Sequence, residues 1–184
     1  MYNLEILERD IKNIKINISE EDVLSFLKIR KRWPVKYLTN QPSIEIIDNL
    51  GNNDFGNSLF FDSEGYLIYD KWLEIYNLGY TTIMSNILDL HQDLRNLQKY
   101  LNNSFGKRMN GNFYFSKGGQ LPSFILHNHE YDVIVKQIYG TGHWILNNNE
   151  LVLQEQNTLV IPARSNHQVY KITDKKLSLT INLM

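Results

Sequence analysis

The sequence of 184 residues contains no cysteine. This absence excludes disulfide bonds and thiolate metal ligands. A transition metal in this protein must therefore be held by histidine or carboxylate side chains.

Long hydrophobic runs are also absent. No apolar stretch approaches the roughly 18 residues of a membrane-spanning helix, and residues 1–5 lack the basic and apolar regions of a signal peptide. The formal net charge of −1 gives no reason to expect a surface for nucleic acid or membrane. We therefore expect a cytoplasmic protein that has neither of these partners.

The residues that are present describe an ordinary globular chain. Hydrophobic residues make up 42% and charged residues 21% of the sequence, which is typical of a single folded domain. A chain of this length can bury a sizeable core.

The first 40 residues are interpreted as an N-terminal extension that packs on the main unit, residues 41–184. Residues 1–18 carry alternating apolar positions (Ile11, Ile14, Ile16 and Ile18), which indicates an edge strand or a loose arm. Ser19 followed by Asp22 predicts the start of a helix, and Pro34 predicts that this helix ends before Trp33. The basic residues between 28 and 32 favour a helix C-terminus, with an anion site as the alternative.

The middle of the chain mixes short strands, loops and one clear helix. Residues 34–38, 43–47 and 81–84 are predicted strands, residues 49–65 are predicted loops, and residues 66–76 show no decisive period. Leu90, Leu94, Leu97 and Leu101 fall on one face of a helix that we expect to end near residues 102–103. His91 lies on that helix outside the leucine stripe, which is typical of a solvated histidine.

From residue 109 onward the pattern is almost entirely that of short strands separated by turns, which favours a sandwich or barrel. The predicted strands are 109–116, 123–129, 132–139, 143–146, 151–154, 158–161, 168–172 and 177–183.

Three histidines in this region form a candidate metal site. His127 and His129 alternate along a predicted strand and so share a face. His167 follows Pro162 at the start of a later strand, which antiparallel pairing can bring opposite the pair. Three imidazoles leave coordination positions open, as catalytic metal sites require. The alternative is that the histidines belong to the core or make only hydrogen bonds.

A family resemblance rests on several segments that occur in order. These are residues 79–83, the leucine helix, residues 112–114, the His-x-His segment, residues 131–135, 137–140, 143–144, 161–162, 167–168 and 179–181. With these segments, residues 72–182 resemble the cupin-type domain of the JmjC and ribosomal-oxygenase group of iron- and 2-oxoglutarate-dependent hydroxylases. The resemblance implies a mainly β fold, a cupin-like double-stranded β-helix or jelly-roll barrel. An N-terminal helix and one amphipathic helix would precede its core.

The sequence departs from that group at two positions. His129 stands where the group has a carboxylate ligand, and Gly142 stands where it has a lysine or arginine that pairs with 2-oxoglutarate. Lys136, Arg164 and Lys117 are the nearest candidates to replace that cation. The resemblance further implies that Tyr114 helps to hold the co-substrate.

Other side chains near the histidines each allow two interpretations of their role. Gln137 is a candidate for orienting a ligand or substrate, with a buried glutamine bonded to the backbone as the alternative. Tyr114 is a candidate pocket hydroxyl or a packing residue. Glu130 is a weaker alternative to His129 as ligand, because adjacent residues on a strand face opposite ways. Asp132 is expected to cap a turn, and Trp144 to lie in the core or at the rim.

Together these observations predict an enzyme, a non-haem iron dioxygenase. His127, His129 and His167 would hold Fe(II), and the substrate would be a small molecule. Three histidines also suit Zn, Ni, Mn or Cu. The alternatives are a 2-oxoglutarate-dependent hydroxylase with a relocated anchor, a non-oxidative isomerase, cyclase or lyase, and a binding protein without catalysis. The resemblance also allows a homodimer.

Overall fold

The structure is a computed structural model that describes residues 3–29, 31–32, 43–48, 50, 59–119 and 123–184. Its helices are α1 (Leu4–Asn13), α2 (Glu20–Lys28), α3 (Tyr69–Asn77) and α4 (Gln92–Phe105). Its first strands are β1 (Lys31–Arg32), β2 (Ser43–Ile47), β3 (Thr81–Met84), β4 (Asn110–Ser116) and β5 (Asp132–Tyr139). The remaining strands are β6 (Gly142–Leu146), β7 (Asn149–Leu153), β8 (Thr158–Ile161), β9 (His167–Ile172) and β10 (Lys176–Leu183).

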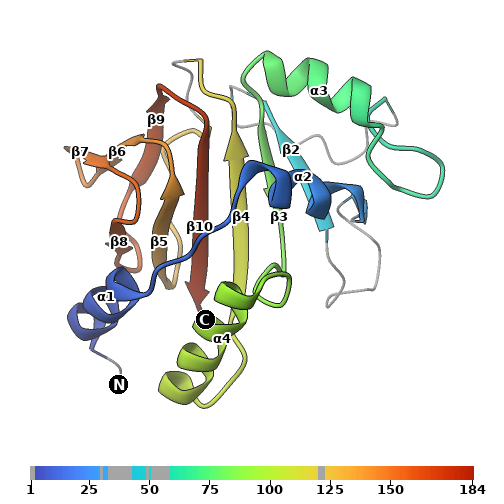
Figure 1. The fold of residues 1–184 in the computed structure, drawn as a ribbon. Helices are drawn as coiled ribbons and strands as arrows, with labels where there is room; N and C mark the ends of the chain where they lie inside the picture. Colours follow the sequence, from blue (N-terminus) through green and yellow to red (C-terminus); the bar gives the residue numbers. More distant parts are fainter. Residues whose placement is uncertain (1–2, 30, 33–42, 49, 51–58, 120–122) are drawn as a thin grey trace.

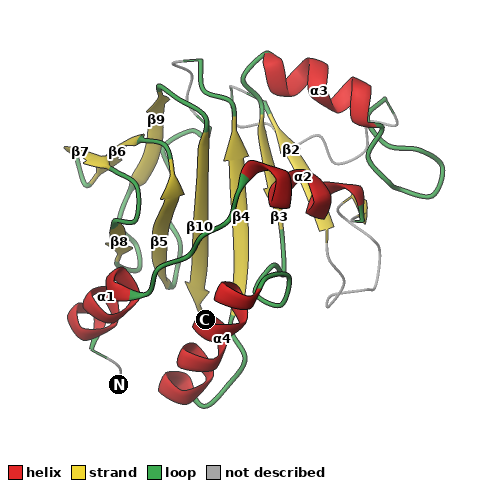
Figure 2. Ribbon diagram, in the orientation of Figure 1, coloured by secondary structure: helices red, strands yellow, loops and turns green. Residues whose placement is uncertain are grey.

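The strands form two sheets, and the fold is mainly β as predicted (Figure 2). The large sheet has the order β1-β2-β3-β4-β10-β5-β8, and the small sheet has the order β7-β6-β9. All pairings between described strands are antiparallel except that of β1 with β2. Strand β10 is an inner strand of the large sheet, between β4 and β5 (Figure 1).

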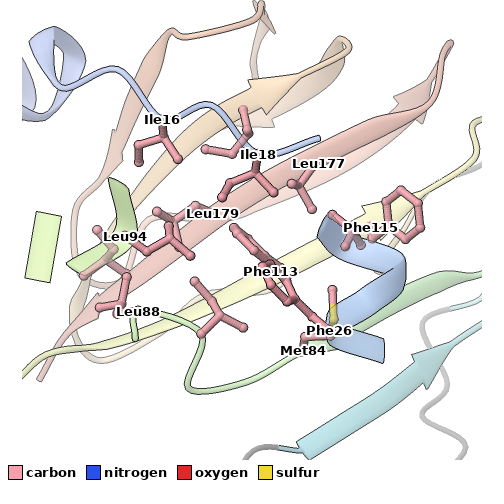
Figure 3. Packing of buried hydrophobic residues seen from close by; sticks show 14 of the residues in the cluster. Ile16, Ile18, Phe26, Met84, Leu88, Leu94, Phe113, Phe115, Leu177 and Leu179 are labelled. Carbon is pink, nitrogen blue, oxygen red and sulfur yellow. The ribbon is translucent and has the colours of Figure 1, made fainter. Parts of the chain in front are cut away.

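Helices cover one face of the large sheet. Figure 1 shows α1 and α2 in front of its strands, and Figure 3 shows Phe26 of α2 and Leu94 of α4 packed among residues of β4 and β10. Leu177 and Leu179 of β10 belong to this core, as do Phe113 and Phe115 of β4. Because side chains alternate along a strand, the residues between them face the other way.

The opposite face of the large sheet packs on the small sheet. A separate apolar cluster joins the two, with Val133 and Val135 on β5, Trp144 on β6 and Val169 on β9. Polar residues of β10, Ser178 and Thr180 among them, lie on this second face. The space between the two sheets is therefore the place where a site can form.

The expected edge strand or arm at residues 1–18 was wrong in its first half. Residues 4–13 form α1, which begins at the N-cap Asn3 and buries Leu7 and Ile11. The recurrence of Leu4, Leu7 and Ile11 at helical spacing outweighs the alternation on which the strand prediction relied. After α1 the chain is extended, and Ile16 and Ile18 are buried in the core.

The second helix is confirmed in its start, but of the basic residues expected at its C-terminus Lys28 lies in the last turn, whereas Lys31 and Arg32 form β1. Ser19 and Asp22 form a reciprocal capping box, and α2 ends at Lys28. The predicted boundary at residues 40 and 41 and the predicted strand 34–38 lie outside the described residues. Strand β2 has the predicted bounds.

Two helices of the middle segment differ from the sequence-based expectation. Residues 66–76, which showed no decisive period, include most of α3, where Trp72 and Tyr76 stack on each other with ring centroids 4.9 Å apart. The leucine helix is confirmed, but it starts at Gln92 and ends at Phe105, beyond the expected end at 102–103. His91 is its N-cap, and its Nδ1 accepts a hydrogen bond from the Asp93 amide.

Seven of the eight predicted C-terminal strands are present, with bounds shifted by two residues at most. The exception is the predicted strand 123–129, which is a loop that makes one isolated bridge from His127 to His167. No described helix has both the length and the apolar character that crossing a bilayer would require.

Candidate metal centre and cavity

The loop before β5 brings His127 and His129 to the start of β9. The backbone amide of His127 donates to the His167 carbonyl over 3.1 Å, and the His167 amide donates back over 2.8 Å. The His129 carbonyl accepts a bond from the Arg164 amide over 2.6 Å. Backbone bonds thus tie both histidines of the loop to the segment that carries the third.

The three imidazole rings form one cluster, as the sequence predicts. Their centroids lie 5.0 Å apart for His127 and His129, 4.4 Å for His127 and His167, and 5.1 Å for His129 and His167. One nitrogen from each ring lies within 4.8 Å of the other two. His129 also stacks on Tyr131, with centroids 5.1 Å apart and an interplanar angle of 7°.

Backbone carbonyls orient two of the rings. Nδ1 of His127 lies 2.8 Å from the Ile125 carbonyl oxygen, and Nδ1 of His167 lies 2.9 Å from that of Ser165. A carbonyl oxygen can only accept, so each Nδ1 carries the proton and each Nε2 keeps its lone pair. This is the arrangement in which outer hydrogen bonds fix the tautomer of a metal-ligating histidine.

Burial also favours the neutral form of His129 and His167. It lowers the pKa of His167 to about 4, and the neighbouring His127 and His129 add to this effect, against the Ser165 carbonyl, which raises it. The pKa of His129 is lowered too, first by burial and then by His127. Neutral imidazoles are the form that binds metal ions. The donor set therefore fits a divalent transition metal.

A cavity of about 220 Å³ opens beside the histidines between the two sheets. It is lined by Tyr114, Ser123, Phe124, His127, His129, Val133, Val135, Trp144, Ile161, His167, Val169, Lys176, Ser178 and Thr180. Most of this wall is apolar. Its polar groups are those of the three histidines, of Lys176, Ser178 and Thr180 on β10, and of Tyr114, Ser123 and Trp144.

The proposed replacement cations do not reach this cavity. Val135 faces the cavity, so its neighbour Lys136 faces the helices, where its Nζ donates to the carbonyl oxygens of Ile11, Lys12 and Gln156. Arg164 is exposed and pairs with Glu130 over 2.9 Å. Lys117 is also exposed, and it donates to the Asn77 side chain. The structure therefore does not support binding of a co-substrate by Lys136 or Arg164.

A cation that the sequence did not suggest lines the cavity instead. Lys176 is 2% exposed, and its Nζ donates to Ser178 Oγ over 3.1 Å. A Cβ atom added at Gly142 would lie 3.5 Å from Lys176 Cδ and 3.0 Å from Trp144 Nε1. The missing side chain at 142 thus leaves the room that Lys176 and Trp144 occupy. The alternation of Lys176, Ser178 and Thr180 along β10 was the sequence feature that could have indicated this polar face.

The remaining candidates divide between the cavity and its surroundings. Tyr114 lines the cavity, and burial raises the pKa of its hydroxyl, which stays protonated. Gln137 is fully buried but is not part of the cavity wall; its Oε1 accepts from Ser178 Oγ over 2.9 Å. Glu130 is exposed and bonds Arg164. Asp132 accepts from the Ala163 amide, in keeping with a capping role.

Comparisons with known proteins find similarity to solved structures. No family model matches the sequence, and no curated protein matches it. Among solved structures, YcfD, a ribosomal oxygenase from Escherichia coli, matches with a TM-score of 0.61 at 15% identity over 92% of this chain. YcfD in complex with cobalt and succinic acid gives the same TM-score at 14% identity, again over 92% of this chain. The chain has a cupin fold.

The cupin resemblance inferred from the sequence is confirmed at the level of the fold. The two YcfD structures carry this conclusion. A weaker similarity, with a TM-score of 0.37 and 21% identity, is to a cupin 2 conserved barrel domain protein from Leptotrichia buccalis, over 41% of this chain and 36% of that one. This chain covers only 44% and 45% of the two YcfD chains, less than half their length.

Proposed function

We propose that this cupin is a metal-dependent oxygenase in which His127, His129 and His167 hold Fe(II) and the substrate is a small molecule. The observation that carries the proposal is the histidine cluster, where carbonyl-bound Nδ1 atoms leave Nε2 of His127 and His167 free. When bound, non-haem iron supplies chemistry with dioxygen that no side chain provides.

The cavity supports a small substrate. Its volume of about 220 Å³ lies below the roughly 300–1,000 Å³ of sites for drug-sized ligands. Val133, Val135 and Val169 give it an apolar wall that excludes water from the reacting groups. Tyr114 supplies a protonated hydroxyl that can donate a hydrogen bond to a ligand in this space.

The first test identifies the metal and its dependence on the cluster. Protein purified without added metal should contain iron, or take up one equivalent of Fe(II) without oxygen present. Nitric oxide then serves as a spin probe for an iron centre with an open coordination position. We expect its signal to vanish in His127→Ala, His129→Ala and His167→Ala. The signal should remain in His143→Ala, whose ring lies beside Tyr170 and outside the cluster.

The second test asks for oxygen chemistry. Oxygen uptake by the iron-loaded protein is measured with small carboxylic acids, each with and without 2-oxoglutarate. Uptake that depends on the three histidines supports the oxygenase. Stoichiometric zinc in the purified protein, together with no oxygen uptake after iron loading, contradicts it and favours a non-oxidative cupin.

A 2-oxoglutarate-dependent hydroxylase is the second candidate, because one observation favours it. The cavity contains a buried cation, Lys176, although Gly142 offers none. The YcfD structure with cobalt and succinic acid has the same fold. Uptake of oxygen that strictly requires 2-oxoglutarate would select this candidate over a dioxygenase that acts on its substrate alone.

A further inference from the structure

The cavity wall contains a cation without an anionic partner. Lys176 is buried, and none of the ion pairs between described residues includes it. Its Nζ donates a hydrogen bond to the neutral hydroxyl of Ser178. A buried charge without a counter-charge is costly, and burial lowers the pKa of Lys176 to about 8. Binding of an anion next to this ammonium group would therefore offset the free-energy cost of its burial.

Its surroundings hold it in position and leave donors unused. Ser178 Oγ donates its proton to Gln137 Oε1, so it can only accept from Lys176. The Gln137 amide is itself fixed by the carbonyl oxygens of Tyr139 and Leu177, over 2.7 and 3.3 Å. Since an ammonium group has three donors, Lys176 keeps donors for a ligand after the bond to Ser178 is made.

A second donor lies close by. Trp144 is 6% exposed and lines the cavity, and its Nε1 is buried without a hydrogen-bond partner among the described residues. Both Trp144 Nε1 and Lys176 Cδ lie within 3.5 Å of one point, the place where a Cβ at Gly142 would stand. Leaving an indole N–H unpaired in the protein costs free energy that a ligand acceptor would recover.

The register of the small sheet separates this pair from the histidines. Gly142 pairs with Ile172 at one end of β6, whereas Leu146 pairs with His167 at the other. Four residues of strand span roughly 13 Å. The cavity therefore has imidazoles toward one end, the two donors toward the other, and the apolar Val133, Val135 and Val169 in its wall.

We propose that Lys176 and Trp144 Nε1 bind a carboxylate group of an elongated small molecule whose other end reaches the three histidines. A carboxylate fits because it has one charge to match one ammonium group, and two oxygens to accept from two donors. The part of this inference that concerns the histidines rests on the proposed function. The carboxylate site itself rests only on the side chains of the cavity.

The test measures binding without redox chemistry. Zinc-loaded protein is titrated by calorimetry with succinate, with 2-oxoglutarate and with succinamide, an uncharged analogue of similar length. We expect saturable binding of the two carboxylates and none of succinamide. Lys176→Met should weaken carboxylate binding at least tenfold, and Trp144→Phe should weaken it severalfold.

Lys136→Met is the matched control. Lys136 is also a fully buried lysine whose pKa is lowered to about 8, but it faces the helices and does not line the cavity. Its replacement should cost stability without changing the affinity of the folded protein for carboxylates. Thermal melting of each variant shows that it is folded before affinities are compared.

Two outcomes would overturn the proposal: no saturable binding of either carboxylate to the wild-type protein, or wild-type affinity in folded Lys176→Met. A carboxylate site that depends on Lys176, in a protein without oxygen uptake, would keep this inference and remove the proposed function. With iron bound, conversion of 2-oxoglutarate to succinate and CO₂ with oxygen uptake identifies it as co-substrate. Binding without conversion assigns the site to a carboxylate of the substrate.

Discussion

Two lysines of adjacent strands show how the face of a sheet decides what a buried cation does. Lys136 and Lys176 are both almost fully buried, and burial lowers both pKa values to about 8. Lys136 points to the helices and bonds three carbonyl oxygens, two of them from the last turn of α1, where cations are favoured. Lys176 points the other way, into the cavity. The first is a structural residue, and the second is available to a ligand.

The titration of Lys176 gives a prediction for carboxylate binding. Only the protonated ammonium attracts an anion, so affinity should be steady below the lowered pKa of about 8 and fall above it. We expect binding of succinate to zinc-loaded protein to be about tenfold weaker at pH 9 than at pH 7. Calorimetry across this range measures the effect.

Lys176→Arg is the control for that profile. A guanidinium group stays charged throughout this range, so its succinate affinity should change little between pH 7 and pH 9. The same steep loss in the arginine variant would show that another group, and not Lys176, sets the pH dependence.

At the level of single residues, the sequence predicted the histidine cluster better than the rest of the candidate site. The His-x-His pair and the later histidine carry a recognisable spacing, and the structure brings all three together. Lys176 was missed because alternating polar and apolar residues in β10 indicate only that the strand has a polar face. Whether that face meets water or a cavity depends on the small sheet, which is built from residues far away in the chain.

At the level of elements, the errors have a common physical cause. Residues 4–13 and 69–77 are short amphipathic helices whose buried faces were hidden among other apolar residues. Residues 123–129 look like a strand but pair with β9 only at His127. Their two-residue spacing still predicted the clustering of His127 and His129 correctly, although the regular strand on which that inference relied does not form.

The turn between β5 and β6 gives a prediction about an element boundary. Gly140 has a φ of +73°, and a Cβ there would lie 2.1 Å from the backbone oxygen of Lys175. Gly140→Ala must therefore shift the start of β10 and, with it, Lys176. We expect a loss of more than about 2 kcal/mol in the free energy of unfolding, with weaker succinate binding, as measured by denaturant unfolding and calorimetry.

Gly106→Ala separates strain from collision. Gly106 has a similar φ of +67° at the end of α4, but a Cβ there meets no atom within 4 Å. Gly106→Ala should lower the free energy of unfolding by only about 1 kcal/mol and leave succinate binding unchanged. Equal losses in the two variants would contradict the role given to the close approach at Gly140.

At the scale of the whole molecule, the sequence was sufficient for the class of fold. Frequent short strands separated by turns predicted two facing sheets, and the order of the segments predicted a cupin. It was not sufficient for the packing of the N-terminal segments, because contacts such as that of Lys136 with the end of α1 join residues 125 positions apart. A homodimer and a cytoplasmic location stay predictions.

Metal removal gives a prediction for overall stability. An ion that binds only the folded protein stabilises it by about 2.7 kcal/mol at one hundred times its Kd, which is a rise in Tm of roughly 5–10 °C for a chain of this size. Thermal melting with Zn(II), and again after a chelator, measures this shift. The shift should be lost in His167→Ala and kept in His143→Ala. An equal shift in His167→Ala would show that the ion binds elsewhere.

The reciprocal backbone bonds between His127 and His167 have a consequence for the order of folding. They close a loop of 40 residues, within which β5 to β8 lie. Contacts over such a separation are made late, after the entropy of closing the loop has been overcome. In a chain whose small sheet is still unformed, His167 does not lie beside His127 and His129. We therefore expect such a chain to bind a divalent metal more weakly than the folded protein does.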